Sequence, residues 1–101
     1  MSSRSDILAQ IAAVGDAKAA LERDMEATES YTRHMNEQRM AQEDILRGSY
    51  DESTKAAAQR EHDYLVEILA ELYERQRQGY EEMQRLRDAE RTLAISLRSA
   101  R

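Results

Sequence analysis

The chain of 101 residues contains no cysteine, proline or tryptophan, and its formal net charge is −5. The lack of cysteine excludes disulfides, thiolate catalysis and cysteine-based zinc sites. The negative charge disfavours nucleic-acid binding by the whole surface, because such binding needs a positive field facing the phosphates. No run approaches the ~20 apolar residues that span a bilayer, and the N-terminus lacks the apolar core of a signal peptide. We expect a soluble, cytoplasmic protein with no membrane contact.

The first helix is expected from about residue 5 to residue 47. Its apolar side chains recur at the alternating spacing of three and four residues that forms a coiled-coil seam. Beyond the middle of the helix, the same line becomes largely polar. The line runs through Ile7, Ile11, Val14, Lys18, Leu21, Met25, Thr28, Thr32, Met35, Arg39, Gln42, Ile45 and Leu46.

A turn is predicted over residues 48–50. Gly48 can adopt the left-handed conformation that ends a helix, and Ser49 with Glu52 fits the S-x-x-E capping box that begins the next one. A chain folded at this turn would place opposite one another residues whose numbers sum to about 98. That register would also bring His34 and His62 within about a turn of each other, as polar filler or as a pH-sensitive pair.

The second helix is expected over about residues 51–99, and its seam alternates without interruption. The seam runs through Ala58, His62, Leu65, Leu69, Leu72, Gln76, Gly79, Met83, Leu86, Glu90, Leu93 and Leu97. A glycine inside a helix costs about 1 kcal/mol relative to alanine, so a break near Gly79 would give a three-helix bundle. The prediction is an all-α fold in a single domain over residues 1–101, a long antiparallel helical hairpin or coiled coil, with the three-helix bundle as the alternative.

A broad apolar face distinguishes the middle of the second helix. On a helical wheel its side chains cover roughly 200°, about twice the arc that faces a single neighbouring helix. This apolar arc consists of Tyr64, Leu65, Val66, Ile68, Leu69, Leu72 and Tyr73. The polar part of the first helix around residues 28–35 is not expected to cover it. The arc is therefore either the core of a bundle, within one chain or between copies, or a docking face for another protein.

Charge is unevenly distributed along the chain. Residues 1–82 carry about −8, and residues 83–101 carry about +3. Three arginines of this end, Arg85, Arg87 and Arg91, could contact an acidic partner, or else complement the dipole at the end of a helix. A small nucleic-acid-associated module that uses this basic end is therefore kept as an alternative function.

Motifs for catalysis are missing from the sequence. It has no glycine-rich phosphate loop, no G-x-S-x-G and no H-E-x-x-H, and the carboxylates cluster on faces predicted to be exposed. The positions three before the two histidines are not glutamate, which excludes the usual di-iron helical bundle. We therefore expect no enzyme activity, no cofactor and no metal.

Two short segments carry a resemblance to a known family. Tyr50-Asp51 after the turn, and the run of residues 65–69 downstream, resemble tubulin-binding cofactor A over residues 45–75. Members of that family are small acidic bundles of antiparallel helices that act as chaperones holding β-tubulin, so the resemblance implies a chaperone associated with microtubules and the cytoskeleton. From the residues themselves we predict a non-enzymatic helical interaction or scaffold protein. It would dock a partner, helical or a second copy, through the apolar face of its second helix.

Overall fold

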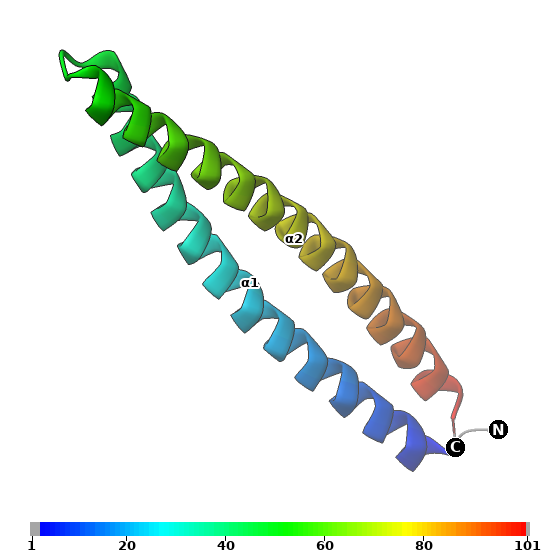
Figure 1. The fold of residues 1–101 in the computed structure, drawn as a ribbon. Helices are drawn as coiled ribbons and strands as arrows, with labels where there is room; N and C mark the ends of the chain where they lie inside the picture. Colours follow the sequence, from blue (N-terminus) through cyan, green and yellow to red (C-terminus); the bar gives the residue numbers. More distant parts are fainter. Residues whose placement is uncertain (1–2, 101) are drawn as a thin grey trace. The chain divides into compact units, whose positions relative to one another are not determined.

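The computed structural model describes residues 3–100 as two long α-helices joined by a short turn (Figure 1). Helix α1 spans Arg4–Arg47, and helix α2 spans Glu52–Ser99. No strand occurs within residues 3–100. The fold is all-α, an antiparallel helical hairpin, as the sequence predicts.

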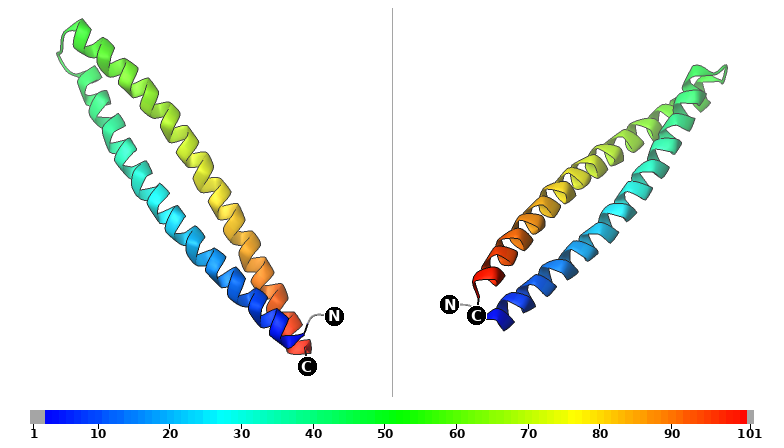
Figure 2. Two further views of the ribbon diagram at one scale, coloured as in Figure 1. Left: turned by 60° about the horizontal axis from the view of Figure 1, so that its bottom comes forward. Right: turned by 180° about the vertical axis from the view of Figure 1, so that it is seen from behind.

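Helix α2 continues through Gly79, so the alternative of a break there, and with it a three-helix bundle, is wrong (Figure 2). Gly79 is buried, and a Cβ added to it would lie 3.1 Å from Cγ of Met25. The missing side chain thus leaves room for Met25 against the backbone of α2. Glycine at this position serves a close approach between the helices.

The first helix begins with a reciprocal cap that the sequence analysis missed. Ser3 Oγ accepts a hydrogen bond from the Asp6 backbone N–H at 3.1 Å, and Asp6 Oδ2 accepts one from the Ser3 N–H at 3.4 Å. Each side chain therefore satisfies a backbone donor that the first turn leaves without a partner. The S-x-x-D spacing in the sequence is the signal that could have identified it.

The predicted chemistry of the turn is wrong in two respects. No described residue has a positive φ, so Gly48 is not left-handed; its N–H instead donates to the Ile45 carbonyl at 3.1 Å, the tight closure of a 3₁₀ turn. A Cβ at Gly48 would lie 2.8 Å from the ring of Tyr50, so glycine here makes room for that ring. The cap of α2 is Asp51, whose Oδ1 accepts a 2.7 Å hydrogen bond from the Thr54 N–H, rather than Ser49 with Glu52. The hydrogen bonds from Thr54 lower the pKa of Asp51.

Both predicted seam lines are confirmed, since each of their residues is buried or half-buried. The predicted register is wrong, because Lys18 lies against Glu90 and Met25 lies against Gly79. A sum of 98 would have placed them opposite residues 80 and 73. The first buried residue of α2 is Ala58, whereas the helix begins at Glu52.

The chain divides into two compact units, one containing residues 1–26 and 77–101 and the other containing residues 27–76. In the first unit, Ile7 and Met83 are buried, and an ion pair lies in the seam. Lys18 Nζ is 3.2 Å from Glu90 Oε2, and the two side chains are 24% and 44% exposed. A polar pair inside an apolar seam favours one register, because any slip would leave its charges without partners.

The second unit contains the main apolar cluster, in which Met35 of α1 packs with Leu65, Leu69 and Leu72 of α2. The adjoining polar part of the seam is also buried and is satisfied by hydrogen bonds. Thr32 Oγ1 donates to the Thr28 carbonyl at 2.7 Å and accepts a 3.2 Å hydrogen bond from Gln76 Nε2. No buried side-chain nitrogen or oxygen of the described residues lacks a partner. Burial of these threonines therefore leaves no unpaired polar group.

Candidate functional site

The structure divides the apolar arc into a covered part and an exposed part. Leu65, Leu69 and Leu72 are buried, and Ile68 is half-buried beside them. The expectation that residues 28–35 cannot cover the arc is therefore wrong for its central side chains, because Met35 fills the seam there. These leucines are core residues.

The remaining three residues of the arc face solvent. Tyr64 is 59% exposed, Val66 is 44% exposed and Tyr73 is 53% exposed. Val66 and Tyr73 are seven residues apart and lie on the same flank of α2, whereas the helical period places Tyr64 on the opposite flank. The arc therefore presents two separate exposed edges.

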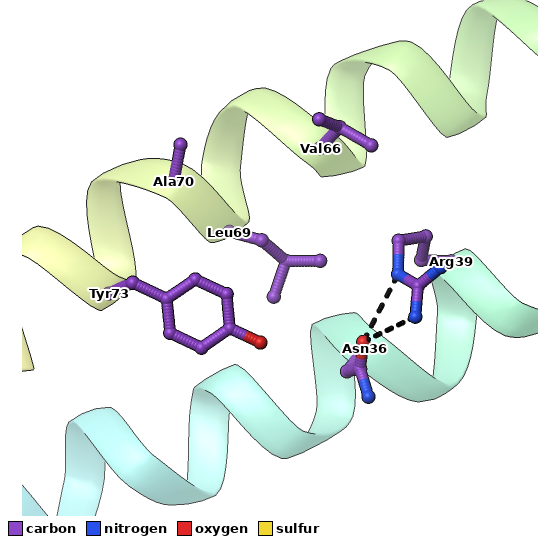
Figure 3. Close-up of a pocket in the computed structure, with 6 residues that line it drawn as sticks. All are labelled: Asn36, Arg39, Val66, Leu69, Ala70 and Tyr73. Carbon is purple, nitrogen blue, oxygen red and sulfur yellow. Dashed lines mark hydrogen bonds between the residues drawn. The ribbon is translucent and has the colours of Figure 1, made fainter.

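An open depression of about 370 Å³ lies on the flank of Val66 and Tyr73 (Figure 3). We call it the α2 groove; its lining residues are Val66, Leu69, Ala70 and Tyr73 of α2 with Asn36 and Arg39 of α1. The site predicted from the sequence did not include Ala70, Asn36 or Arg39. An alanine placed between two large apolar residues, four after Val66 and three before Tyr73, is the pattern that could have pointed to the hollow.

The α2 residues of the groove have a geometry that is typical of helix packing. Val66, Leu69, Ala70 and Tyr73 occupy positions i, i+3, i+4 and i+7, and four residues in this diamond form the hole that receives one knob in a coiled coil. The hole is built on a rigid helix, and its floor, Leu69, is fixed in the core. The groove is thus shaped to accept a side chain from a neighbouring helix.

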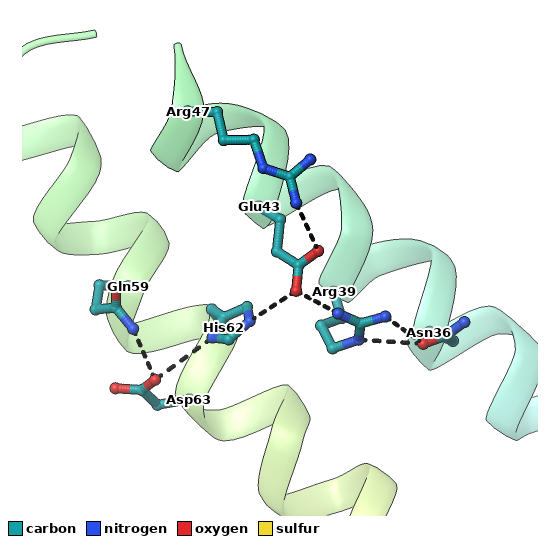
Figure 4. Close-up of polar contacts among 7 residues, drawn as sticks. All are labelled: Asn36, Arg39, Glu43, Arg47, Gln59, His62 and Asp63. Atoms are coloured by element: carbon teal, nitrogen blue, oxygen red, sulfur yellow. Dashed lines mark hydrogen bonds and ion pairs between the residues drawn. The ribbon is translucent and has the colours of Figure 1, made fainter.

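A polar network fixes the α1 side of the groove (Figure 4). Arg39 donates from Nε and Nη2 to Asn36 Oδ1 at 3.1 and 2.9 Å, and its Nη1 forms an ion pair with Glu43. Glu43 also lies 3.2 Å from His62 Nε2 and 3.7 Å from Arg47 Nη2. The hydrogen bond to His62, together with Arg39, lowers the pKa of Glu43. The network holds the Arg39 guanidinium in place and neutralises it.

The two histidines do not form the pair that the expected register implied. His62 lies against Glu43, and His34 shares a 3.0 Å hydrogen bond with Gln38 on its own helix. The different register of the hairpin accounts for this. No group of three or more histidines, aspartates or glutamates in residues 3–100 could hold a metal ion.

The three arginines predicted to contact an acidic partner are exposed on α2 in the other unit. Arg85 Nη1 is 2.6 Å from Glu82 Oε2, and Arg91 Nη1 is 3.8 Å from Asp88 Oδ1. Exposed pairs of this kind contribute at most about 1 kcal/mol, so they leave the arginines able to exchange partners.

Models of known protein families, curated proteins and solved structures show no match to this chain. The resemblance to tubulin-binding cofactor A therefore stays a prediction. In the structure, Tyr50 packs its ring against Gly48 and Asp51 caps α2, so both residues that carry the resemblance at the turn have structural roles. Neither helix has, within the described residues, a stretch long and apolar enough to cross a membrane.

Proposed function

We propose that this protein is a non-enzymatic helical interaction protein that docks a further α-helix in the α2 groove. The observation that supports this most directly is the diamond of Val66, Leu69, Ala70 and Tyr73, which has the form of a coiled-coil hole and is open to solvent beside Asn36 and Arg39 of α1. The residues that the hairpin needs for its own core lie on the seam. Val66 and Tyr73 lie beside it and are available for binding.

The energy available at the groove is consistent with a reversible interaction. Complete burial of a large apolar side chain contributes about 1.5–3 kcal/mol, and Val66 and Tyr73 each retain about half of their surface for a partner to cover. Together they would contribute about 1.5–3 kcal/mol, so neighbouring contacts must supply the rest of the affinity.

The test is site-specific photo-crosslinking in cells that produce the protein. A benzophenone amino acid replaces Tyr73 in one sample, and it replaces Tyr64, an equally exposed tyrosine on the opposite flank, in the matched control. We expect a discrete crosslinked partner from position 73 that is much weaker from position 64. Crosslinking from position 73 that does not exceed the control would refute the proposal.

A second variant separates docking from folding. Leu69→Asp is unsuitable, because Leu69 is only 4% exposed and a buried carboxylate would unfold the core. Val66→Lys alters an exposed wall of the groove and should leave the helical circular dichroism spectrum and its melting transition unchanged. We expect the crosslink from position 73 to be lost in this folded variant.

A further inference from the structure

We propose that the helix docked in the α2 groove is α2 of a second copy of this chain, which inserts Ile95 into the diamond and aligns its arginines with acidic residues beside the groove. The inference deepens the proposed function and rests on it. It depends on two exposed surfaces of α2 that have opposite charge and matching spacing.

The first surface borders the groove. Asp63, Glu67 and Glu74 are exposed, and together with Ala70 they occupy positions i, i+4, i+7 and i+11 of one helical face. We call these three carboxylates the acidic edge. They follow the outer side of the groove, because Ala70 is both a member of this face and part of the groove lining.

The second surface lies on the C-terminal part of α2. Arg87, Arg91, Ile95 and Arg98 occupy positions i, i+4, i+8 and i+11 and are all exposed. Ile95 is 58% exposed, which is a large fraction for a branched apolar side chain. We call these four residues the basic ridge. Its one apolar side chain, Ile95, is therefore accompanied by three arginines that can bind carboxylates.

The two surfaces match when the α2 helices of two copies lie parallel with an offset of 24 residues. Asp63 then faces Arg87 of the second copy, Glu67 faces its Arg91, and Glu74 faces its Arg98. In the same alignment Ile95 of the second copy falls within one residue of Ala70. One offset therefore brings three carboxylate–guanidinium pairs and one apolar knob into register, and Arg can bind each carboxylate through two donors.

The distribution of charge favours this arrangement over a symmetric one. Residues 27–76 contain eleven acidic and six basic groups, whereas residues 83–101 carry about +3. A symmetric pairing of two grooves would place two acidic edges together, and like charges at an interface are unfavourable. The repulsion between Arg39 at the groove and the incoming arginines is reduced, because Arg39 forms an ion pair with Glu43.

Such an interface is heterologous, because it joins two different surfaces. After two copies pair, one still has an unoccupied groove and the other an unoccupied ridge. Association therefore continues beyond two copies, either into an open chain or into a closed ring. Since charged pairs provide the register, the association should weaken as salt is added.

The test is sedimentation velocity on the full chain over a range of concentrations, at about 50 mM and about 500 mM salt. We expect reversible growth beyond a dimer with concentration, and less of it at the higher salt. Glu67→Arg and Arg91→Glu should each weaken association about ten-fold or more, and an equimolar mixture of the two variants should restore it. Glu22→Arg and Arg23→Glu are the matched controls. They make the same charge changes at exposed positions of α1, outside the acidic edge and the basic ridge, and should leave association unchanged.

The apolar contact has its own test. Val66→Lys removes the groove, and Ile95→Lys removes the ridge, so each variant should be monomeric alone. Their equimolar mixture retains one intact groove and one intact ridge, and it should stop at a 1:1 heterodimer. A wild-type chain that is monomeric throughout at low salt would overturn the inference, as would a dimer that is indifferent to Ile95→Lys. The proposed function would survive either result if position 73 still crosslinked to a different protein.

Discussion

Replacing each of the three glycines by alanine tests the packing of the hairpin one position at a time. Gly15 lies inside α1, and a Cβ added to it meets nothing within 4 Å. Alanine there loses no contact, and it restricts the unfolded chain more than glycine does. Gly15→Ala is therefore expected to raise the free energy of unfolding by about 1 kcal/mol.

The same substitution at the other two glycines should give smaller or opposite effects. At Gly79 the new methyl group would lie 3.1 Å from Cγ of Met25, so the gain in helix propensity is offset by a shift of that flexible side chain. The net change should be a stabilisation smaller than that at Gly15, between zero and about 0.5 kcal/mol. At Gly48 the Cβ would lie 2.8 Å from the Tyr50 ring, and Gly48→Ala should lower the free energy of unfolding by about 1 kcal/mol as the ring is displaced.

Urea unfolding followed by circular dichroism at 222 nm measures all three changes, provided that the slope of free energy against urea stays constant. The expected order of stability is Gly15→Ala first, then Gly79→Ala, then wild type, and Gly48→Ala last. If Gly79→Ala stabilised the chain as much as Gly15→Ala, the contact between Met25 and the α2 backbone would be refuted. A gain at Gly48 would likewise refute the packing of Tyr50 against that glycine.

Three further substitutions test the core and its polar contacts. Glu43→Gln should reduce the loss of stability in acid. The hydrogen bond to His62 lowers the Glu43 pKa below its ordinary value of 4.5, so the ionised carboxylate stabilises the fold above that pH. This contribution disappears as the pH falls through the pKa of Glu43 in the folded protein. Urea unfolding at pH 7 and pH 3 measures it, and an equal loss of stability in wild type and Glu43→Gln would contradict the prediction. Replacing Lys18 and Glu90 together by leucine should relax the register without lowering the free energy of unfolding, because leucine can fill the same half-buried positions. A double-mutant cycle should give a coupling below about 1 kcal/mol, because Glu90 is 44% exposed. Leu69→Ala should lower the free energy of unfolding by about 2–5 kcal/mol, and a loss below 1 kcal/mol would contradict its place in the core.

Much of the hairpin could be predicted because its seam is a local, periodic property. Every residue of both predicted seam lines is buried or half-buried, including the polar positions Thr28, Thr32 and Gln76. The turn was harder to predict, because two overlapping patterns compete there. Ser49 with Glu52 fits one helix start and Asp51 with Thr54 fits another, and the path of the chain decides between them.

The candidate site was only partly predictable. The apolar arc spans the segment of α2 that carries the groove, but the sequence pattern could not separate the core leucines from the exposed Val66 and Tyr73. That division depends on Met35, which reaches the arc from the other helix. Asn36 and Arg39 join the groove for the same reason, since only packing of the two helices brings them beside it.

The sequence by itself determined that this chain forms two long helices with one continuous seam each, because helical periodicity and the absence of proline act along a single helix. Tertiary structure alone decided the register of the hairpin, and therefore which residues meet across it. The register pairs Lys18 with Glu90 and His62 with Glu43, and it leaves an open depression beside Ala70 on one flank of α2. These outcomes depend on the path of the turn and on the sizes of side chains from both helices, which no pattern within one helix encodes.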